Sequence, residues 1–149
     1  MIYYLFALLA GFAATLQAGI NGKLQVFLGS PLLTSFVSFL VGSVGLGAAY
    51  LATVFYQAQP IPSFASLTQT SIWMWSGGLL GAFFVFTTIF CLPKIGFANL
   101  FSLIVAGQLL LAIFFDHYGL LGNTLHLLNP YRLLGVALLV TGVYLIQTH

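Results

Sequence analysis

The sequence has almost no charge. Of its 149 residues, 61% are hydrophobic and 3% are charged, and the charged side chains are Lys23, Lys94, Asp116 and Arg132. So few polar side chains cannot cover the surface of a soluble domain. Lys and Arg are also too sparse and too scattered to form a nucleic-acid interface, so no nucleic-acid partner is expected. The composition instead predicts an integral membrane protein whose surroundings are the lipid bilayer.

Cysteine is scarce and glutamate is absent. The single cysteine, Cys91, excludes an intrachain disulfide, and the sequence contains no glutamate. Neither a CxxC pair nor a His and Cys spacing of the kind that binds zinc is present, so no metal and no cofactor are expected. The apolar segments also lack a convergent set of nucleophilic or titratable side chains, so an enzyme is not expected.

Long apolar runs are what the sequence does have. Residues 24–93 carry no charge, far more than the ~20 residues that one membrane crossing requires. Polar stretches such as "NGKLQ", the segment 57–71 and "PKIG" divide the chain. The pattern predicts one all-α domain, residues 1–149, with five transmembrane helices at about 2–20, 32–55, 72–92, 97–115 and 133–146. A cleaved signal peptide is the alternative for the first run, which however lacks a basic n-region.

An odd number of helices places the two termini on opposite sides of the membrane. Lys23 and Lys94 then lie on the side of the C-terminus, and Arg132 lies on the side of the N-terminus. The positive-inside rule favours a cytoplasmic C-terminus, but by one side chain only. So small a bias does not fix one orientation.

Two amides in the first apolar run, Gln17 and Asn21, share one helix face with small residues. An amide without a partner is costly in lipid, so these groups either join neighbouring helices or line a polar cavity. In the fourth run Gln108 lies nearer the middle than Asn99 and on the opposite face. We therefore expect Gln108 in the cavity and Asn99 at a helix end or subunit contact. The candidate solute-binding residues are Gln17, Asn21, Ser38, Phe39, Phe84 and Gln108.

Small residues recur at helical spacing in several of the apolar runs. Such stripes let helix backbones approach closely, which is how helices associate in lipid, where no hydrophobic force drives them together. The glycines predicted to pack helices are Gly42, Gly45, Gly77, Gly81, Gly135 and Gly142.

The chain's only acid, Asp116, ends the fourth apolar run, and its only arginine, Arg132, stands at the start of the fifth. An ionised side chain at mid-bilayer costs at least ~2.5 to 3.5 kcal/mol, so Asp116 is expected at the water interface. Asp116 and Arg132 are predicted to form a structural interface pair across the intervening loop. The alternative is that Asp116 and His117 relay protons for coupled transport.

The order of these motifs resembles a known family. The segments are "LLAGFAATLQAGINGKL", the "PKIG" turn, "AGQ" around Gln108, "DHYGLLG", and the "RLLG" that opens the last helix. Over essentially the whole chain they resemble the short YdcZ-like branch of the drug/metabolite transporter superfamily. The resemblance implies a multi-pass protein of the bacterial inner membrane that is half of a transporter and works as a dimer. As for many members of the family, it also implies insertion in both orientations and antiparallel pairing.

An antiparallel homodimer suits a chain with an odd number of helices. Two copies related by an axis in the membrane plane recreate the inverted repeat from which larger transporters build a site at the bilayer midplane. A heterodimer with a paralogue of opposite charge bias is the alternative.

The function predicted from the residues and the resemblance is transport of a small organic solute by a secondary transporter or facilitator. Small multidrug members of the superfamily bind lipophilic cations with a glutamate in the first helix, whereas this chain offers Gln17 and Asn21 there. A neutral or zwitterionic solute, held by amides and by aromatic walls such as Phe39, Phe83 and Phe84, fits better. The alternative is a non-transporting assembly or accessory subunit, which would use the glycine stripes to bind partner helices.

Overall fold

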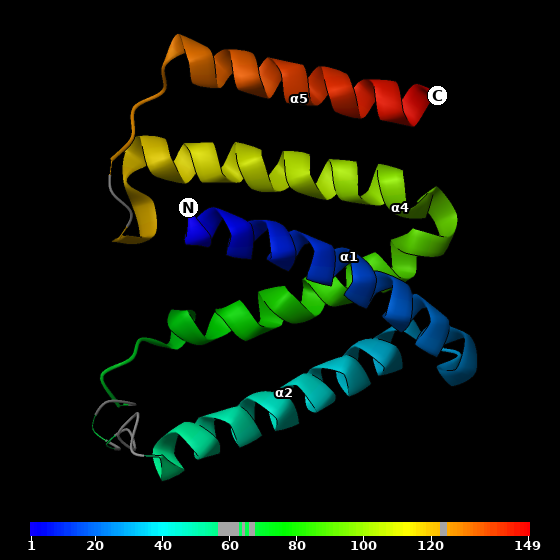
Figure 1. Ribbon diagram of the computed structural model, residues 1–149, viewed down its shortest axis with the longest axis vertical. Helices are drawn as coiled ribbons and strands as arrows, with labels where there is room; N and C mark the ends of the chain where they lie inside the picture. Colours follow the sequence, from blue (N-terminus) through cyan, green and yellow to red (C-terminus); the bar gives the residue numbers. More distant parts are fainter. Residues whose placement is uncertain (57–62, 64, 66–67, 123–124) are drawn as a thin grey trace. The chain divides into compact units, whose positions relative to one another are not determined.

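The computed structural model describes residues 1–56, 63, 65, 68–122 and 125–149, and within these all regular secondary structure is helical (Figure 1). Four of the helices are long and apolar enough to cross a membrane, in agreement with an all-α membrane protein. The chain forms two compact units, Met1–Pro93 and Lys94–His149, called here the first unit and the second unit. The single five-helix domain stays a prediction, and most of the expected loop 57–71 lies outside the described residues.

Helix α1 (Ile2–Leu28) is longer than the predicted first helix. It continues through "NGKLQ" instead of ending near residue 20, so the turn expected there is wrong. The physical reason is that a glycine such as Gly22 costs a helix interior only about 1 kcal/mol. The helix ends at Gly29, whose left-handed backbone (φ 70°, ψ −4°) lets its N–H donate to the carbonyl of Gln25 at 2.8 Å.

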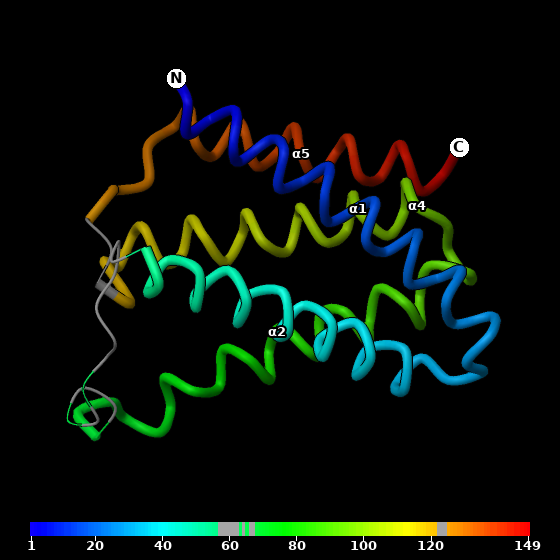
Figure 2. Tube along the Cα trace, turned by 60° about the horizontal axis from the view of Figure 1, so that its bottom comes forward, coloured from blue at the N-terminus to red at the C-terminus, as the bar shows by residue number. Residues whose placement is uncertain are grey.

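Helix α2 (Pro31–Phe55) follows at once and runs in the opposite direction to α1, so the two form a hairpin (Figures 1 and 2). Ser30 starts it, because the Ser30 Oγ accepts a hydrogen bond from the N–H of Leu33 at 3.3 Å. Pro31 occupies the first helical position, where its missing N–H has no cost. The sequence "GSP" thus ends one helix and starts the next.

Helix α4 (Ser76–Tyr118) follows a short 3-10 turn, η1 (Ile72–Trp75), and has 43 residues. At 1.5 Å per residue this is about 65 Å of helix, roughly twice the ~30 Å core of a bilayer. One residue inside it, Gly96, is not helical and has φ 75° and ψ 171°. Just before it, Pro93 offers no N–H to the helix. The break lies between the predicted third and fourth transmembrane helices.

The buried core of the first unit is small and half polar. Its members are Ala18, Asn21, Thr34, Ser35, Val85, Thr88, Ile89 and Leu92. They come from the second half of α1, the first turns of α2 and the first half of α4. Helix α1 lies close to the side chain of Leu92 on α4 at Gly22, where an added Cβ would be 3.3 Å from Cδ2 of Leu92. Packing of small residues and hydrogen bonding therefore hold this core together, as is usual in lipid.

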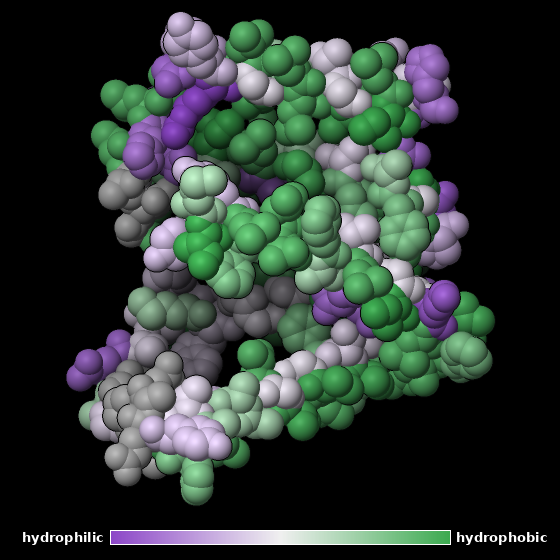
Figure 3. All heavy atoms as spheres, viewed as in Figure 1, coloured by the Kyte–Doolittle hydropathy of each residue, from purple (hydrophilic) through white to green (hydrophobic). Residues whose placement is uncertain are grey.

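Large apolar side chains outside this core are mostly exposed. Figure 3 shows apolar side chains over much of α1 and α2, and Phe12 and Leu46 are 61% and 74% exposed. Water would strongly oppose so large an apolar surface. The acyl chains of a bilayer cover it without cost, so the exposure pattern agrees with the composition.

The second unit contains the rest of α4, a short turn η2 (Leu120–Gly122), and α5 (Pro130–Thr148). Helix α5 begins slightly earlier than the predicted 133, because Asn129 caps it. Its Oδ1 accepts from the N–H of Arg132 at 2.8 Å, and Pro130 takes the first helical position. This cap places Arg132 in the first turn of α5.

Candidate functional site

The amide of Asn21 joins α1 to α2. Its Nδ2 donates a hydrogen bond to Oγ of Ser38 at 3.1 Å, and Asn21 is only 4% exposed. Two of the predicted solute-binding residues are therefore in direct contact. An amide carries two N–H donors and a carbonyl acceptor, so one bond to Ser38 does not use all of its hydrogen-bonding capacity.

The other buried polar groups of the first unit are hydroxyls that bond to their own helices. Thr34 donates to the carbonyl of Ser30 at 2.8 Å, and Ser35 donates to the carbonyl of Pro31 at 2.7 Å. Thr88 donates to the carbonyl of Val85 at 2.8 Å. Each hydroxyl proton is thus satisfied without a partner helix, which lets these residues sit in an apolar environment.

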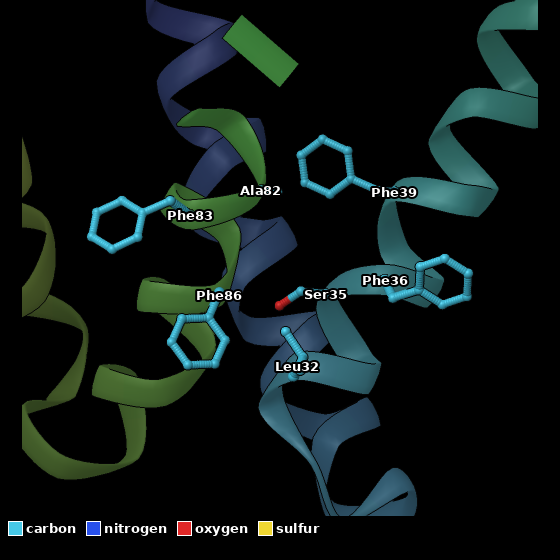
Figure 4. Close-up of a pocket in the computed structure, with 7 residues that line it drawn as sticks. All are labelled: Leu32, Ser35, Phe36, Phe39, Ala82, Phe83 and Phe86. Atoms are coloured by element: carbon cyan, nitrogen blue, oxygen red, sulfur yellow. The ribbon is translucent and has the colours of Figure 1, made fainter. Parts of the chain in front are cut away.

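A groove of about 460 Å³ lies between α2 and the first half of α4 (Figure 4). Its lining residues are Leu32, Ser35, Phe36, Phe39, Ala82, Phe83 and Phe86. Figure 4 shows the Ser35 hydroxyl between the two helices, with Phe83 and Phe86 on the α4 side and Phe36 at the outer rim of α2. The lining contains no ionisable side chain, so the groove favours apolar, uncharged groups.

One wall of the groove depends on a glycine. An added Cβ at Gly81 would lie 3.3 Å from Cζ and 3.7 Å from Cε1 of Phe39. The ring of Phe39 therefore lies against the backbone of α4, and a residue with a Cβ at this position would require the ring to shift. Gly81, predicted as a helix-packing residue, here receives an aromatic ring.

The remaining predicted solute-binding residues lie apart from this contact. Gln17 is exposed on α1, although it precedes the buried Asn21 by about one turn. Phe84 is half-buried on α4 but is not among the residues that line the groove, whereas its neighbour Phe83 is. Gln108 is exposed and belongs to the second unit.

Asn99 lies shortly after the break in α4. Its Nδ2 donates to the carbonyl of Ile95 at 3.0 Å, and its Oδ1 is buried without a hydrogen-bond partner among the described residues. A buried acceptor of this kind is costly. The contact that we predicted for Asn99, at a helix end or with another subunit, would supply the missing donor.

The other glycines of the predicted packing stripes have free space where a side chain would be. An added Cβ would meet no atom of the described residues within 4 Å at Gly42, Gly45, Gly77, Gly135 and Gly142. No helix of the described chain packs on them, so their role in helix association stays a prediction about a partner.

Sequence reasoning did not select five of the seven groove residues as solute-binding, namely Leu32, Ser35, Phe36, Ala82 and Phe86. A signal was present, because Phe36 and Phe39 on α2 and Phe83 and Phe86 on α4 each stand three positions apart. Residues at this spacing share a helix face. Two phenylalanine pairs on two neighbouring helices therefore indicated an aromatic wall on each.

In the second unit, Arg132 and Asp116 tie the start of α5 to the end of α4. Nη1 of Arg132 lies 3.3 Å from Oδ2 of Asp116, and the same nitrogen donates to the carbonyl of His126 at 3.3 Å. The carbonyl of Asp116 in turn accepts from the N–H of His126 at 2.8 Å. The pair and the loop between the helices therefore form one hydrogen-bonded arrangement.

His117 adds a further bond to this loop. Its Nδ1 accepts from the N–H of Leu128 at 3.3 Å, and its ring meets the Tyr118 ring edge-on with centroids 4.8 Å apart. These contacts hold the imidazole against the loop between α4 and α5.

The described residues contain no group of three His, Cys, Asp or Glu side chains that could hold a metal ion. The described residues also provide a hydrogen-bonded amide, an uncharged aromatic groove and an ion-paired loop.

Comparison with known proteins agrees with the motifs. The chain matches, over residues 2–145, the family described as "Putative inner membrane exporter, YdcZ". It is 28% identical over 137 residues to "Inner membrane protein YdcZ" of Escherichia coli (strain K12), and the match covers 90% of this chain and 89% of that protein. No solved structure matches the chain. The resemblance inferred from the sequence is confirmed, as is a location in the inner membrane, and the chain belongs to the YdcZ family.

Proposed function

We propose that this protein is half of a membrane transporter for a small neutral or zwitterionic organic solute. The observation that carries the proposal is the part-buried hydrogen bond between Asn21 and Ser38 in the first unit, which also contains an uncharged groove. Polar groups inside a membrane are costly and usually functional, so this pair marks a solute pathway. The description of the family as an exporter supports transport as the general activity.

The charge of the first unit defines the solute class. Its only charged side chain is Lys23, and no acid occurs between residues 1 and 93. A lipophilic cation would lack a counter-ion near Asn21, and burying an unpaired charge is strongly unfavourable. A solute that is neutral, or that carries its two charges close together, avoids this cost.

The proposed transporter is an antiparallel homodimer of a chain that crosses the membrane five times. Helix α4 supplies two crossings, because its length is about twice the bilayer core and it is broken at Gly96. Two inverted copies would place two Asn21 and Ser38 pairs around one midplane site. Alternating access then follows from rocking of one copy against the other.

A non-transporting accessory subunit is the second candidate. The open glycines, such as Gly42 and Gly45 on α2, favour it, because they offer small-residue surface to a foreign helix. In that role the groove would bind no solute, and Asn21 would only join two helices.

The test is a screen for solute-induced stabilisation of the purified protein. A transporter should show saturable stabilisation by a small set of related solutes, and that set should be taken up or released by proteoliposomes. Asn21→Ala should reduce the stabilisation, while Asn99→Ala serves as a matched amide substitution on another helix. Stabilisation by no solute across a broad metabolite set, with a helical partner protein required for stability, would establish the accessory role instead.

A further inference from the structure

We propose that the groove between α2 and the first half of α4 binds a flat, uncharged aromatic ring, and that Phe39 seated on Gly81 sets its width. The proposal rests on the proposed function, since it assigns the apolar part of the transported solute to this groove. It goes further by naming the chemistry of that part and the residue pair that selects it.

The lining specifies the chemistry of the occupant. Phenylalanine rings come from both helices, Phe39 from α2 and Phe86 from α4, while Phe36 and Phe83 lie at the rim and point away from the space between the helices. Aromatic rings prefer offset or edge-on contact with other rings, which gives a flat ring an advantage over a flexible chain of equal area. The one lining hydroxyl, on Ser35, has donated its proton to the carbonyl of Pro31 and keeps only lone pairs for an occupant.

The size of the groove agrees with one small molecule. Its volume of about 460 Å³ falls within the roughly 300–1,000 Å³ that is usual for small-molecule sites. A ring system with a hydroxyl or N–H at its edge would fill the aromatic part and donate to Ser35. Nothing in the lining would neutralise a charge.

Gly81 controls how far the ring of Phe39 stands from α4. A methyl group at Gly81 would lie 3.3 Å from Cζ of Phe39, which is tighter than ordinary van der Waals contact. The ring, which lines the groove, would have to shift away from α4. Gly77, one turn earlier on the same helix, meets no atom of the described chain within 4 Å and is the matched control.

The first experiment needs no ligand. With 4-fluorophenylalanine in place of Phe39, fluorine NMR should show a changed chemical shift in Gly81→Ala and an unchanged one in Gly77→Ala. An unchanged shift in both variants would show that Gly81 does not seat the ring and would overturn the width argument.

The second experiment compares two uncharged ten-carbon alcohols, 2-naphthol and 1-decanol, on protein in lipid nanodiscs. We expect saturable thermal stabilisation by 2-naphthol and little by 1-decanol. Gly81→Ala should weaken the apparent affinity for 2-naphthol by about three- to tenfold, the value of one aromatic contact, while Gly77→Ala leaves it unchanged. Phe86→Leu should also weaken the apparent affinity for 2-naphthol. This second variant tests the proposal if Gly81→Ala does not fold.

The outcomes separate this proposal from the transporter proposal. Equal stabilisation by 1-decanol would make the groove a lipid site, and dissociation of the dimer by Phe86→Leu would make it a subunit interface. Either result overturns the proposal, as does the absence of any effect of 2-naphthol. Binding of 2-naphthol without transport of any solute by proteoliposomes would instead leave the groove assignment intact and refute the transporter.

Discussion

Nη1 of Arg132 lies 3.3 Å from Oδ2 of Asp116, so the only acid and the only arginine of the chain contact each other. The two side chains keep 34% and 26% of their surfaces exposed. Partial exposure means that water screens the pair, which limits its contribution to stability. The contact is one of several that order the loop between α4 and α5, and its role at an interface stays a prediction.

Asp116→Asn and Arg132→Gln should each lower the free energy of unfolding by about 0 to 1 kcal/mol, because an ion pair this exposed contributes little. The double substitution should add little to either single one. Thermal unfolding of the purified variants measures this. If Asp116 only positions the loop, the pH dependence of solute uptake in proteoliposomes stays unchanged. Loss of proton-driven uptake with solute binding preserved would make Asp116 part of a proton pathway.

The imidazole of His117 is expected to hold the loop at Leu128. Its Nδ1 accepts from the Leu128 N–H, so His117→Leu, which has no acceptor, should speed hydrogen exchange at this amide. His117→Asn, which keeps an acceptor near the position of Nδ1, should preserve slow exchange, and His126→Asn is the control. Unchanged exchange in His117→Leu would show that the bond does not hold the loop.

The amides are predicted to act in solute binding. Gln17→Ala, Asn21→Ala and Gln108→Ala should weaken solute-dependent stabilisation and leave the dimer intact, with Asn99→Ala as the comparison. A double-mutant cycle of Asn21→Ala and Ser38→Ala should give a coupling near the ~0.6 kcal/mol average for hydrogen bonds between membrane helices. Unfolding or dissociation of all three variants, without selective loss of binding, would identify the amides as packing groups.

Dual insertion is tested by cysteine labelling. Single cysteines at the N-terminus and in place of Thr148, on a Cys91→Ser background, should each react with an impermeant reagent from both sides of the membrane in similar amounts. We expect both orientations because one side of the membrane would carry only one more Lys or Arg side chain than the other. Labelling of each position from one side only would establish a fixed orientation and a parallel or heteromeric assembly.

Gly96→Ala should destabilise the protein by about 1 to 3 kcal/mol, because φ 75° with ψ 171° is a backbone conformation that residues with a Cβ rarely adopt. Gly11→Ala, in the helical part of α1, should be neutral or stabilising, because alanine has the higher helix propensity. Chemical unfolding in detergent measures both. Equal effects of the two substitutions would mean that Gly96 is not held in the left-handed region.

The sequence predicted the helices better than their ends and contacts. The caps Ser30 and Asn129, each followed by proline, were not used to predict helix starts, so α5 was expected to begin at about 133 and not at Pro130. The end of α1 was predicted wrongly, because Gly22 resembles the true stop at Gly29 and only the packing around each decides. A helical wheel likewise placed Gln17 and Asn21 on one face but could not show that buried contacts of α1 begin at Ala18.

The groove was predicted in part for a related reason. Phe39 was selected as an aromatic wall residue, whereas Phe86 was not, since the rotation of α4 about its axis depends on how it meets α2. The contact between the Phe39 ring and Gly81 joins two residues that are far apart in the chain. Such a pairing follows from tertiary contact, which helical periodicity alone does not contain.

The back-bonded hydroxyls of the first unit have a consequence for chemical selectivity. Thr34 and Thr88 are 0% and 3% exposed, so Ser35, which lines the groove, is the one of the three hydroxyls that an occupant of the groove would meet. Its proton is directed to the carbonyl of Pro31, so its remaining hydrogen-bonding capacity consists of oxygen lone pairs. We therefore expect the groove to receive the end of a solute that carries an alcohol or an amide N–H, and a carboxylate of the same solute to lie outside it.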